Sequence, residues 1–327
     1  MSYGTQGLGR ARGRRSAVGY PAQYSIGNAG ASGAITDPDA FILTVETTGA
    51  SETMEIQGSG TGHLYDINWG DGTVETSQTA ASPSHVYASA GTHTITITGT
   101  YKRIYVNNNA TYKTKYRTVE QWGDVGMTNM NAAFYGCSGL TSIATDPPNV
   151  TNFSNCFTFC TSLASLPTGL FDNNTAVTNF IACFVGCTSL TSLPTGLFDN
   201  NTAVTYFSFC FTGCTSLTTA GFGTWAWGAV TDATGMFSNV TLTTADYNAG
   251  LDGIYQQSTT GGGSGVQSSV AFHAGNSVDT TGPPDGIAAS LSLTVNDAWT
   301  ILDGTADYFV FDGADVIVNS GDYVVNT

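Results

Sequence analysis

The sequence contains a fifteen-residue segment that occurs twice. TSLPTGLFDNNTAVT at 191–205 reappears 27 residues earlier, at 164–178, with one change, Ala164 in place of Thr191. A catalytic site is normally built once in a domain, whereas repetition at a fixed period of about 20–50 residues is typical of stacked structural units. The duplication therefore predicts a repeat architecture.

Related copies begin at residues 132, 155, 182 and 209, and a weaker copy begins at 234. In a stack of coils, equivalent side chains lie above one another and bury an apolar column that one unit cannot bury alone. The alignment predicts columns of phenylalanine, leucine and valine, the valines at steps of 27, 27 and 26 residues: Phe134, Phe157, Phe184 and Phe211; Leu140, Leu163, Leu190 and Leu217; Val150, Val177, Val204 and Val230. We expect a mostly β protein in which residues 127–257 form a leucine-rich-repeat solenoid with short helical turns.

The repeats also resemble a known family. TNMNAAFYGCSGLTSI (128–143) and NVTNFSNCFTFCTSLASL (149–166) are similar to the units of BspA-like leucine-rich repeats. ADYNAGLDGI (245–254) and LTVNDAWTILDG (293–304) resemble the closing segment of such proteins, which implies that 246–304 caps the solenoid. We therefore assign 258–327 to the solenoid cap and a C-terminal β tail. The resemblance implies a protein of a bacterial surface or of a phage particle.

Residues 36–106 alternate between apolar and polar side chains, as strands do. INWGDGTVE (67–75) predicts a hairpin, and together with SHVYASAGTHTITITG (84–99) it resembles the PKD-type immunoglobulin-like β-sandwich, a module that serves mostly as a spacer or binding support. Asp66, Asn68 and Asp71 fit a hydrogen-bonded hairpin corner better than a calcium loop, because Gly70 occupies a ligand position. Residues 107–126 are interpreted as a connector.

All seven cysteines lie in the repeats: Cys137, Cys156, Cys160, Cys183, Cys187, Cys210 and Cys214. Three pairs have C-x-x-x-C spacing, which recurs once per unit as packing positions do. Zinc sites prefer two intervening residues and a single cluster, and the odd count disfavours disulfides. We expect the pairs, together with Phe157, Phe184 and Phe211, to form a structural ladder of buried free thiols and aromatic rings, and we expect no metal and no cofactor.

All nine basic residues precede residue 118. Four lie in a glycine-rich arm, residues 1–35, and five lie between residues 102 and 117; both groups are predicted to anchor the protein to a partner: Arg10, Arg12, Arg14, Arg15, Lys102, Arg103, Lys113, Lys115 and Arg117. From Thr118 onward there is no Lys or Arg, so we expect this acidic part to stay soluble and to repel nucleic acid.

No sequence motif indicates catalysis: the chain has no G-x-S-x-G, no H-E-x-x-H and no phosphate loop, so we expect a protein that is not an enzyme. The first 25 residues lack the apolar core of a signal peptide, and no apolar run is long enough for membrane insertion. Only 10% of the residues are charged, which with the Gly-, Ser- and Thr-rich surface is typical of extracellular or virion proteins.

These features predict a bacteriophage virion structural protein, an outer decoration, fibre or tail-associated component on the virion surface. Its partners would be other virion proteins, bound through the N-terminal arm, and host-surface glycans or proteins. Multicopy or homo-oligomeric assembly is expected, and four aromatic residues are candidate surface contacts, although core packing is the more common role for any one of them: Tyr206, Phe207, Trp225 and Trp227. The alternative is a bacterial cell-surface adhesin or extracellular matrix protein.

Overall fold

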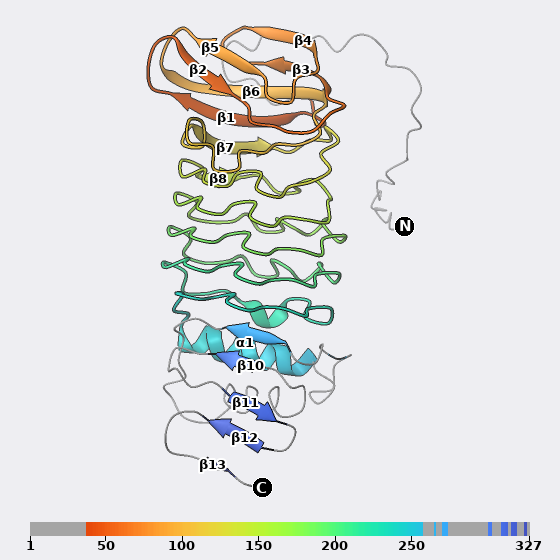
Figure 1. Cartoon of the computed structure of the whole chain (residues 1–327), viewed down its shortest axis with the longest axis vertical. Coiled ribbons are helices and arrows are strands. Elements are labelled where there is room, and N and C mark those ends of the chain that lie inside the picture. Colours follow the sequence, from red (N-terminus) through yellow and green to blue (C-terminus); the bar gives the residue numbers. More distant parts are fainter. Residues whose placement is uncertain are drawn as a thin grey trace, which may run out of the picture. The chain divides into compact units, whose positions relative to one another are not determined.

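The computed structural model describes residues 37–257, Gly265, residues 270–273 and the backbone of four short strands beyond them. Most of its regular structure is β. Residues 37–121 build two facing sheets. The larger sheet has the strand order β4-β3-β6-β1-β7-β8, and the smaller sheet pairs β2 with β5 (Figure 1). The strands are β1 Phe41–Thr47, β2 Glu52–Glu55, β3 Leu64–Asn68, β4 Val74–Gln78, β5 Ser84–Tyr87, β6 Gly91–Thr100, β7 Tyr116–Gln121 and β8 Ser142–Ile143.

The predicted hairpin joins β3 to β4. Trp69 N–H donates to the Thr73 carbonyl (3.0 Å), and Gly70 has φ 83°, a conformation that glycine adopts without strain. A side chain at Gly70 would also overlap the Thr94 carbonyl oxygen, 2.5 Å from an added Cβ. The hairpin is fastened to β5 because the buried Tyr87 hydroxyl donates to the Trp69 carbonyl (2.7 Å) and Asp71 Oδ2 pairs with His85 Nε2 (2.7 Å).

The oxygens considered for calcium serve this corner. Asp71 Oδ1 accepts from Thr73 N–H (2.9 Å), and the amide oxygen Asn68 Oδ1 accepts from Gly70 N–H (2.9 Å). The Asp66 carboxylate accepts from a backbone N–H of β4 (2.8 Å). The hydrogen-bonded hairpin interpretation therefore describes what these side chains do in the structure.

The predicted connector, 107–126, needs correction because it contains β7. This strand pairs antiparallel with β1, and it pairs in parallel with β8, the first strand of the repeats, with Thr118 opposite Ser142. The register between β1 and β7 shifts twice, so the alternation that marks a strand is interrupted in YRTVEQ. The sandwich therefore passes into the repeats through hydrogen-bonded backbone.

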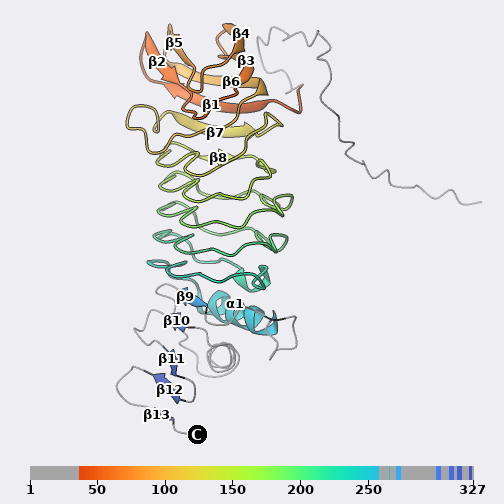
Figure 2. The ribbon, with the colours of Figure 1, turned by 45° about the vertical axis from the view of Figure 1, so that its right-hand side comes forward.

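Successive copies of the repeat lie directly on one another. Isolated parallel bridges link Asn152 to Asn179, Asn179 to Tyr206 and Tyr206 to Asp232, at separations of 27, 27 and 26 residues. Backbone hydrogen bonds also cross between the coils, for example from Phe157 N–H to the Cys183 carbonyl (2.8 Å). Figures 1 and 2 show these coils one after another between β8 and α1 in both views.

The predicted phenylalanine column is confirmed. The rings of Phe134, Phe157, Phe184 and Phe211 are fully buried, and neighbouring centroids lie 5.9, 5.4 and 5.4 Å apart with interplanar angles of 5°, 14° and 1°. Phe237 continues the column at 5.6 Å. The predicted leucine and valine columns are buried as well. One continuous cluster of apolar side chains runs from β1 through the coils.

The segment around each cysteine pair is tighter than the predicted helical turn. Cys160 N–H donates to the Phe157 carbonyl (3.1 Å), three residues back, and the residue before each cysteine is left-handed, with φ 55° at Asn155 and 58° at Phe159. An α-helix cannot continue through such a residue. Each C-x-x-x-C segment is therefore a pair of hydrogen-bonded turns.

The last coil is covered by a helix. Here η1, Phe222–Thr224, packs against α1, Thr244–Gln257, so closely that a side chain at Gly250 would overlap the Phe222 ring, 2.0 Å from an added Cβ. Phe272 of β9, Ala271–His273, also contacts Phe222, at 5.4 Å. The start of the predicted cap thus closes the stack.

Most of the predicted cap and tail, 258–327, lies outside the described residues. The backbone there forms β10 Thr300–Leu302, which pairs in parallel with β9, and a three-stranded sheet of β11 Phe309–Asp312, β12 Asp315–Val318 and β13 Val324–Val325. Across the described part of the chain, no helix has the length and apolar character required to cross a bilayer.

Candidate functional site

The predicted anchoring residues fall into two groups. Those of the N-terminal arm lie outside the described residues: Arg10, Arg12, Arg14 and Arg15. Those of the second group are half-buried: Lys102, Arg103, Lys113, Lys115 and Arg117.

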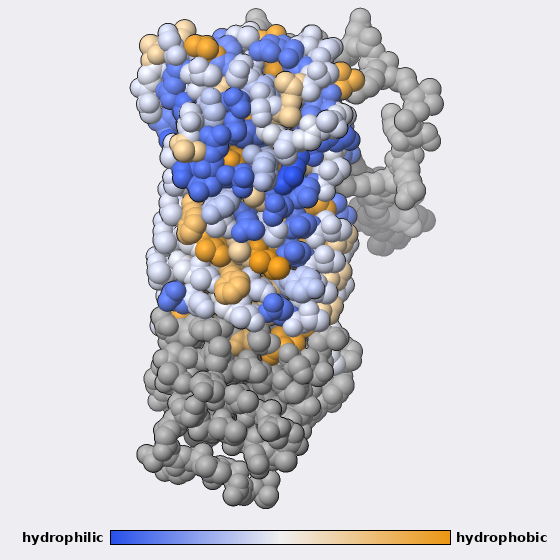
Figure 3. All heavy atoms as spheres, in the orientation of Figure 1, coloured by the Kyte–Doolittle hydropathy of each residue, from blue (hydrophilic) through white to orange (hydrophobic). Residues whose placement is uncertain are grey.

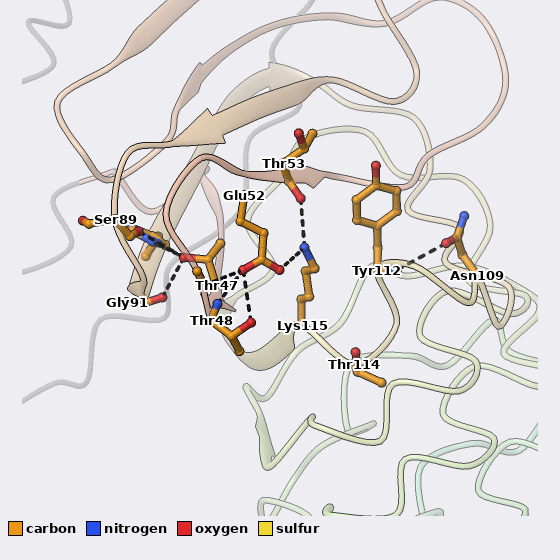
Figure 4. A network of polar contacts seen from close by, with 12 residues as sticks. Thr47, Thr48, Glu52, Thr53, Ser89, Gly91, Asn109, Tyr112, Thr114 and Lys115 are labelled. Atoms are coloured by element: carbon orange, nitrogen blue, oxygen red, sulfur yellow. Dashed lines mark hydrogen bonds and ion pairs between the residues drawn. The ribbon is translucent and has the colours of Figure 1, made fainter.

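Lys115 lies in a network of polar contacts beneath the loop after β1 (Figure 4). Its ammonium pairs with Glu52 Oε1 (2.5 Å) and donates to the Thr53 carbonyl (2.9 Å). Glu52 Oε2 accepts from the backbone N–H of Thr48 (2.5 Å) and of Gly49 (3.0 Å). These contacts tie the β1–β2 loop to the segment that leads into β7.

The other cations of this group also have internal contacts. Arg117 Nε pairs with Glu46 Oε2 (2.6 Å), and Lys113 Nζ donates to Asn108 Oδ1 (2.6 Å). Arg103 donates to the Asn131 carbonyl (3.0 Å), and its guanidinium lies over the ring of Tyr105. In the structure the side chains of Arg103, Lys113, Lys115 and Arg117 make internal contacts, and Arg103 links the sandwich to the first coil through Asn131. Their role as partner anchors stays a prediction. Sequence counting of charges missed Glu46 and Glu52, because acidic partners 63 to 71 positions away carry no local signal.

The Glu52 pair makes stability depend on pH. The hydrogen bond from Lys115, aided by Thr48 N–H, lowers the pKa of Glu52 from 4.5 to about 2. Because the folded-state pKa is below the unfolded value, the stabilisation is present above about pH 4.5 and is lost as the pH falls toward 2. We expect wild type to exceed Glu52→Gln in melting temperature at pH 6 and to converge with it near pH 2.

Measuring both proteins between pH 2 and 7 checks this expectation. Asp71 titrates in the same range: burial raises its pKa, but the hydrogen bonds from His85 and Thr73 outweigh burial and lower the pKa to about 2. It is present in both proteins, so its contribution cancels in the difference. A difference between the two proteins that is the same at every pH would contradict the assignment.

Three of the four predicted contact aromatics are core residues. Phe207, Trp225 and Trp227 are 1%, 0% and 0% exposed, and the indole N–H of Trp227 donates to the Phe222 carbonyl (2.8 Å). The surface-binding prediction is therefore wrong for these three, because they fill the space between the last coil and its cap. Tyr206 is 42% exposed and remains a candidate.

Two exposed aromatic side chains were missed. Phe159 and Phe209 are 46% and 45% exposed, and both have left-handed backbone, with φ 58° and 59°. Such a conformation costs a bulky residue on the order of 1–2 kcal/mol. A sequence signal existed: the positions equivalent to Phe159 in three other coils are Gly136, Gly186 and Gly213.

These two rings and two tyrosines of the same segment of the coils form a set that we call the aromatic edge: Tyr135, Phe159, Tyr206 and Phe209. The ring of Tyr135 lies 6.0 Å from that of Phe159, and Tyr206 and Phe209 lie three residues apart in one coil. Tyr206 shares its bridge-connected row with Asn152, Asn179 and Asp232, all partly exposed. The aromatic edge therefore combines exposed rings with amide and carboxylate groups.

All seven cysteine side chains are fully buried, as the predicted ladder requires. They also make a contact that the sequence did not indicate. Each second cysteine donates from Sγ to the carbonyl of the phenylalanine in the preceding coil: Cys160 to Phe134 (3.3 Å), Cys187 to Phe157 (3.2 Å) and Cys214 to Phe184 (3.1 Å). The thiols thus connect coils as well as fill space.

We expect these thiols to be unreactive in the folded protein. Burial raises the pKa of Cys160 and Cys187 well above its usual range, and a thiol reagent reaches them only after the coils open. Titration with a chromogenic disulfide reagent should show reaction on the order of 100-fold slower than in denaturant, where all seven thiols react. Several fast-reacting thiols in the native protein would contradict the burial, and fewer than seven after non-reducing denaturation would indicate disulfides.

Comparison with known proteins gives two overlapping family matches. Residues 41–113 match the model of the PKD domain, and this segment contains β1 to β6. Residues 103–192 and 128–249 match the family described as Mycoplasma protein of unknown function, DUF285. No curated protein and no solved structure matches the chain. The N-terminal domain is thus of PKD type, and the coils are similar to a family without an assigned function.

Proposed function

We propose that the protein is a non-enzymatic structural protein of the outer surface of a bacteriophage particle, where it displays the coils as a binding face. The observation that carries the proposal is the pairing of one continuous apolar core with exposed, strained aromatic residues on the coils. A rigid scaffold that presents a fixed set of rings lowers the entropy cost of binding.

The histidines of the sandwich have structural partners, which supports a binding role over a catalytic one. Asp71 and His85 fasten a hairpin, His93 Nε2 contacts Thr47 Oγ1 (3.0 Å), and His63 contacts the Ser59 carbonyl (3.2 Å). Each of these groups has a structural partner, so none is placed as the base of a nucleophile.

We further propose that the coils are leucine-rich repeats of the BspA-like type. The support is the regular step of the bridges together with the buried leucine column: Leu140, Leu163, Leu190 and Leu217. The similarity of 103–249 to the DUF285 family is consistent with this assignment. Repeats of this type suit binding, because their successive coils present a row of equivalent side chains.

The N-terminal arm is proposed to attach the protein to other virion proteins, because its four arginines can pair with an acidic partner surface. The alternative, a bacterial adhesin or matrix protein, uses the same binding face but requires no particle.

Mass spectrometry of purified particles separates the two. The virion proposal predicts peptides of this chain in intact particles and their loss when residues 1–30 are deleted. Absence from every particle preparation, with display on cells, would overturn the virion proposal in favour of the adhesin.

A further inference from the structure

The two phenylalanines of the aromatic edge occupy positions where the backbone favours glycine. The row that contains Phe159 has glycine in three of its other coils, and the row that contains Phe209 has Gly235 in the next coil. A large apolar side chain in left-handed backbone, nearly half exposed to water, stabilises neither the turn nor the core. Strain of this kind is characteristic of binding sites.

The rings are also supported from beneath. Phe159 lies against Gly186 of the next coil, where an added Cβ would be 2.4 Å from the ring carbon Cδ1. Phe209 lies in the same way against Gly235, again at 2.4 Å. Because each glycine leaves room for a ring, each phenylalanine is held against the coil while part of it faces solvent. The two Phe–Gly pairs are preformed aromatic platforms.

The surroundings of these platforms are polar, and the cations near them, Lys113 against Gly136 and Arg103 on Asn131, lie at the first coil. Thr178 and Thr205 donate from Oγ1 to carbonyls of the preceding coils (3.3 and 3.1 Å), and Asn152 and Asn179 lie in the neighbouring row. No Lys or Arg occurs after residue 117. In Figure 3, apolar surface on the viewed face of the coils forms separate areas among hydrophilic side chains.

This combination selects the chemistry of the ligand. The C–H face of a pyranose ring is apolar and weakly electropositive, so it stacks on the electron-rich face of an aromatic ring, while its hydroxyls bond to amides, hydroxyls and carboxylates. A protein partner would favour a contiguous apolar patch. Nucleic acid bases also stack on aromatic rings, but their phosphates need cations along the binding face, and the second and later coils contain no Lys or Arg.

We propose that the aromatic edge binds a neutral polysaccharide, with Phe159 and Phe209 as stacking platforms and Tyr135 and Tyr206 beside them. The inference rests on the proposed function, since it assigns a ligand class to the same binding face. The platforms belong to coils two steps apart, which corresponds to roughly 10 Å along the stack at the strand-to-strand spacing, and to rows four positions apart in the repeat. A chain of several sugars can therefore span both platforms, and each adds to the retention of the other.

Affinity electrophoresis of the purified full chain tests the proposal, with a β-glucan, a mannan and a galactan as neutral probes and alginate as an anionic probe. The double variant Phe159→Gly/Phe209→Gly removes both rings. Glycine stands at the position of Phe159 in three other coils and at the position of Phe209 in the next coil, and it adopts left-handed backbone without strain, so we expect the variant to fold. Phe209→Tyr keeps the ring, and Val86→Thr removes an equally exposed apolar group on the sandwich.

We expect at least one neutral polysaccharide to retard the wild type, Phe209→Tyr and Val86→Thr. We expect the double variant to bind the same polysaccharide at least about 10-fold more weakly. Retardation by none of the neutral probes, by alginate alone, or equally in the double variant would overturn the proposal. These outcomes are independent of particle composition. A chain that binds glycan but is absent from particles would refute the virion role alone, and a chain present in particles without glycan binding would refute this inference alone.

Discussion

Replacing Phe184 by alanine lowers the free energy of unfolding by about 3–5 kcal/mol. The ring is fully buried in the middle of the phenylalanine column, and it stacks at 5.4 Å on Phe157 in one direction and on Phe211 in the other. Alanine leaves a cavity between two coils that are fixed by backbone hydrogen bonds, so the coils cannot close around it. Denaturant titration followed by circular dichroism measures the loss.

Phe159→Gly is the matched control, because it removes the same side chain from an exposed position of the neighbouring coil. Glycine relieves the left-handed backbone at this residue, so we expect a change within about 1 kcal/mol. A loss below about 1 kcal/mol for Phe184→Ala, or equal losses for both variants, would contradict the assignment of the column as the core of the coils.

The second large effect is expected at Trp122, which joins the sandwich to the coils. Its indole stacks on Phe41 of β1 at 6.0 Å, meets Phe134 of the first coil edge-to-face at 5.9 Å, and donates to the Ala144 carbonyl (2.9 Å). Trp122→Ala removes contacts to both halves at once. We expect a loss of about 3–5 kcal/mol and the separation of one unfolding transition into two.

Two probes are needed to detect the separation: near-ultraviolet circular dichroism for the aromatic packing and far-ultraviolet dichroism for the backbone. Trp122→Phe is the control, because it keeps an aromatic ring and removes only the indole N–H and part of the volume; we expect a smaller loss and coincident transitions. Coincident transitions in Trp122→Ala as well would show that the two halves do not depend on this residue for their coupling.

The columns and the hairpin of this fold could be predicted from sequence because both have a local signal. A 27-residue period places Phe157 above Phe184 whatever the rest of the chain does, and Asp71-Gly72 between alternating strands marks a turn. The PKD-type domain was recognised from two such motifs in order, and its match to 41–113 agrees with this prediction.

The errors concern residues whose position depends on distant partners. β7 was interpreted as a connector because its shifted register against β1 interrupts the alternation. The ion pairs of Lys115 and Arg117 were not predicted, because Glu52 and Glu46 are remote in sequence. Trp225 and Trp227 lie in a short segment between coils, and only the packing of the capping helix shows that they are buried.

The aromatic edge illustrates a different limit. Phe159 looks like one more core phenylalanine in CFTFC, and only its backbone angle places it outside. Comparison with Gly186 and Gly213 at the same step of the repeat would have shown that the position is turned outward. Residues that differ from their equivalents in the other coils are therefore the first candidates for binding, because the residues that all coils share pack the coils against one another.

Native-state hydrogen exchange tests the central claim, that the sandwich and the coils are one stacked scaffold, most directly. The amides of Phe157, Phe184 and Phe211 donate to the carbonyls of Cys183, Cys210 and Met236 in the following coils. We predict that these three amides exchange with protection close to that of the β1 and β6 amides. Protection confined to residues 41–121, with the three phenylalanine amides exchanging as in an unfolded peptide, would contradict it.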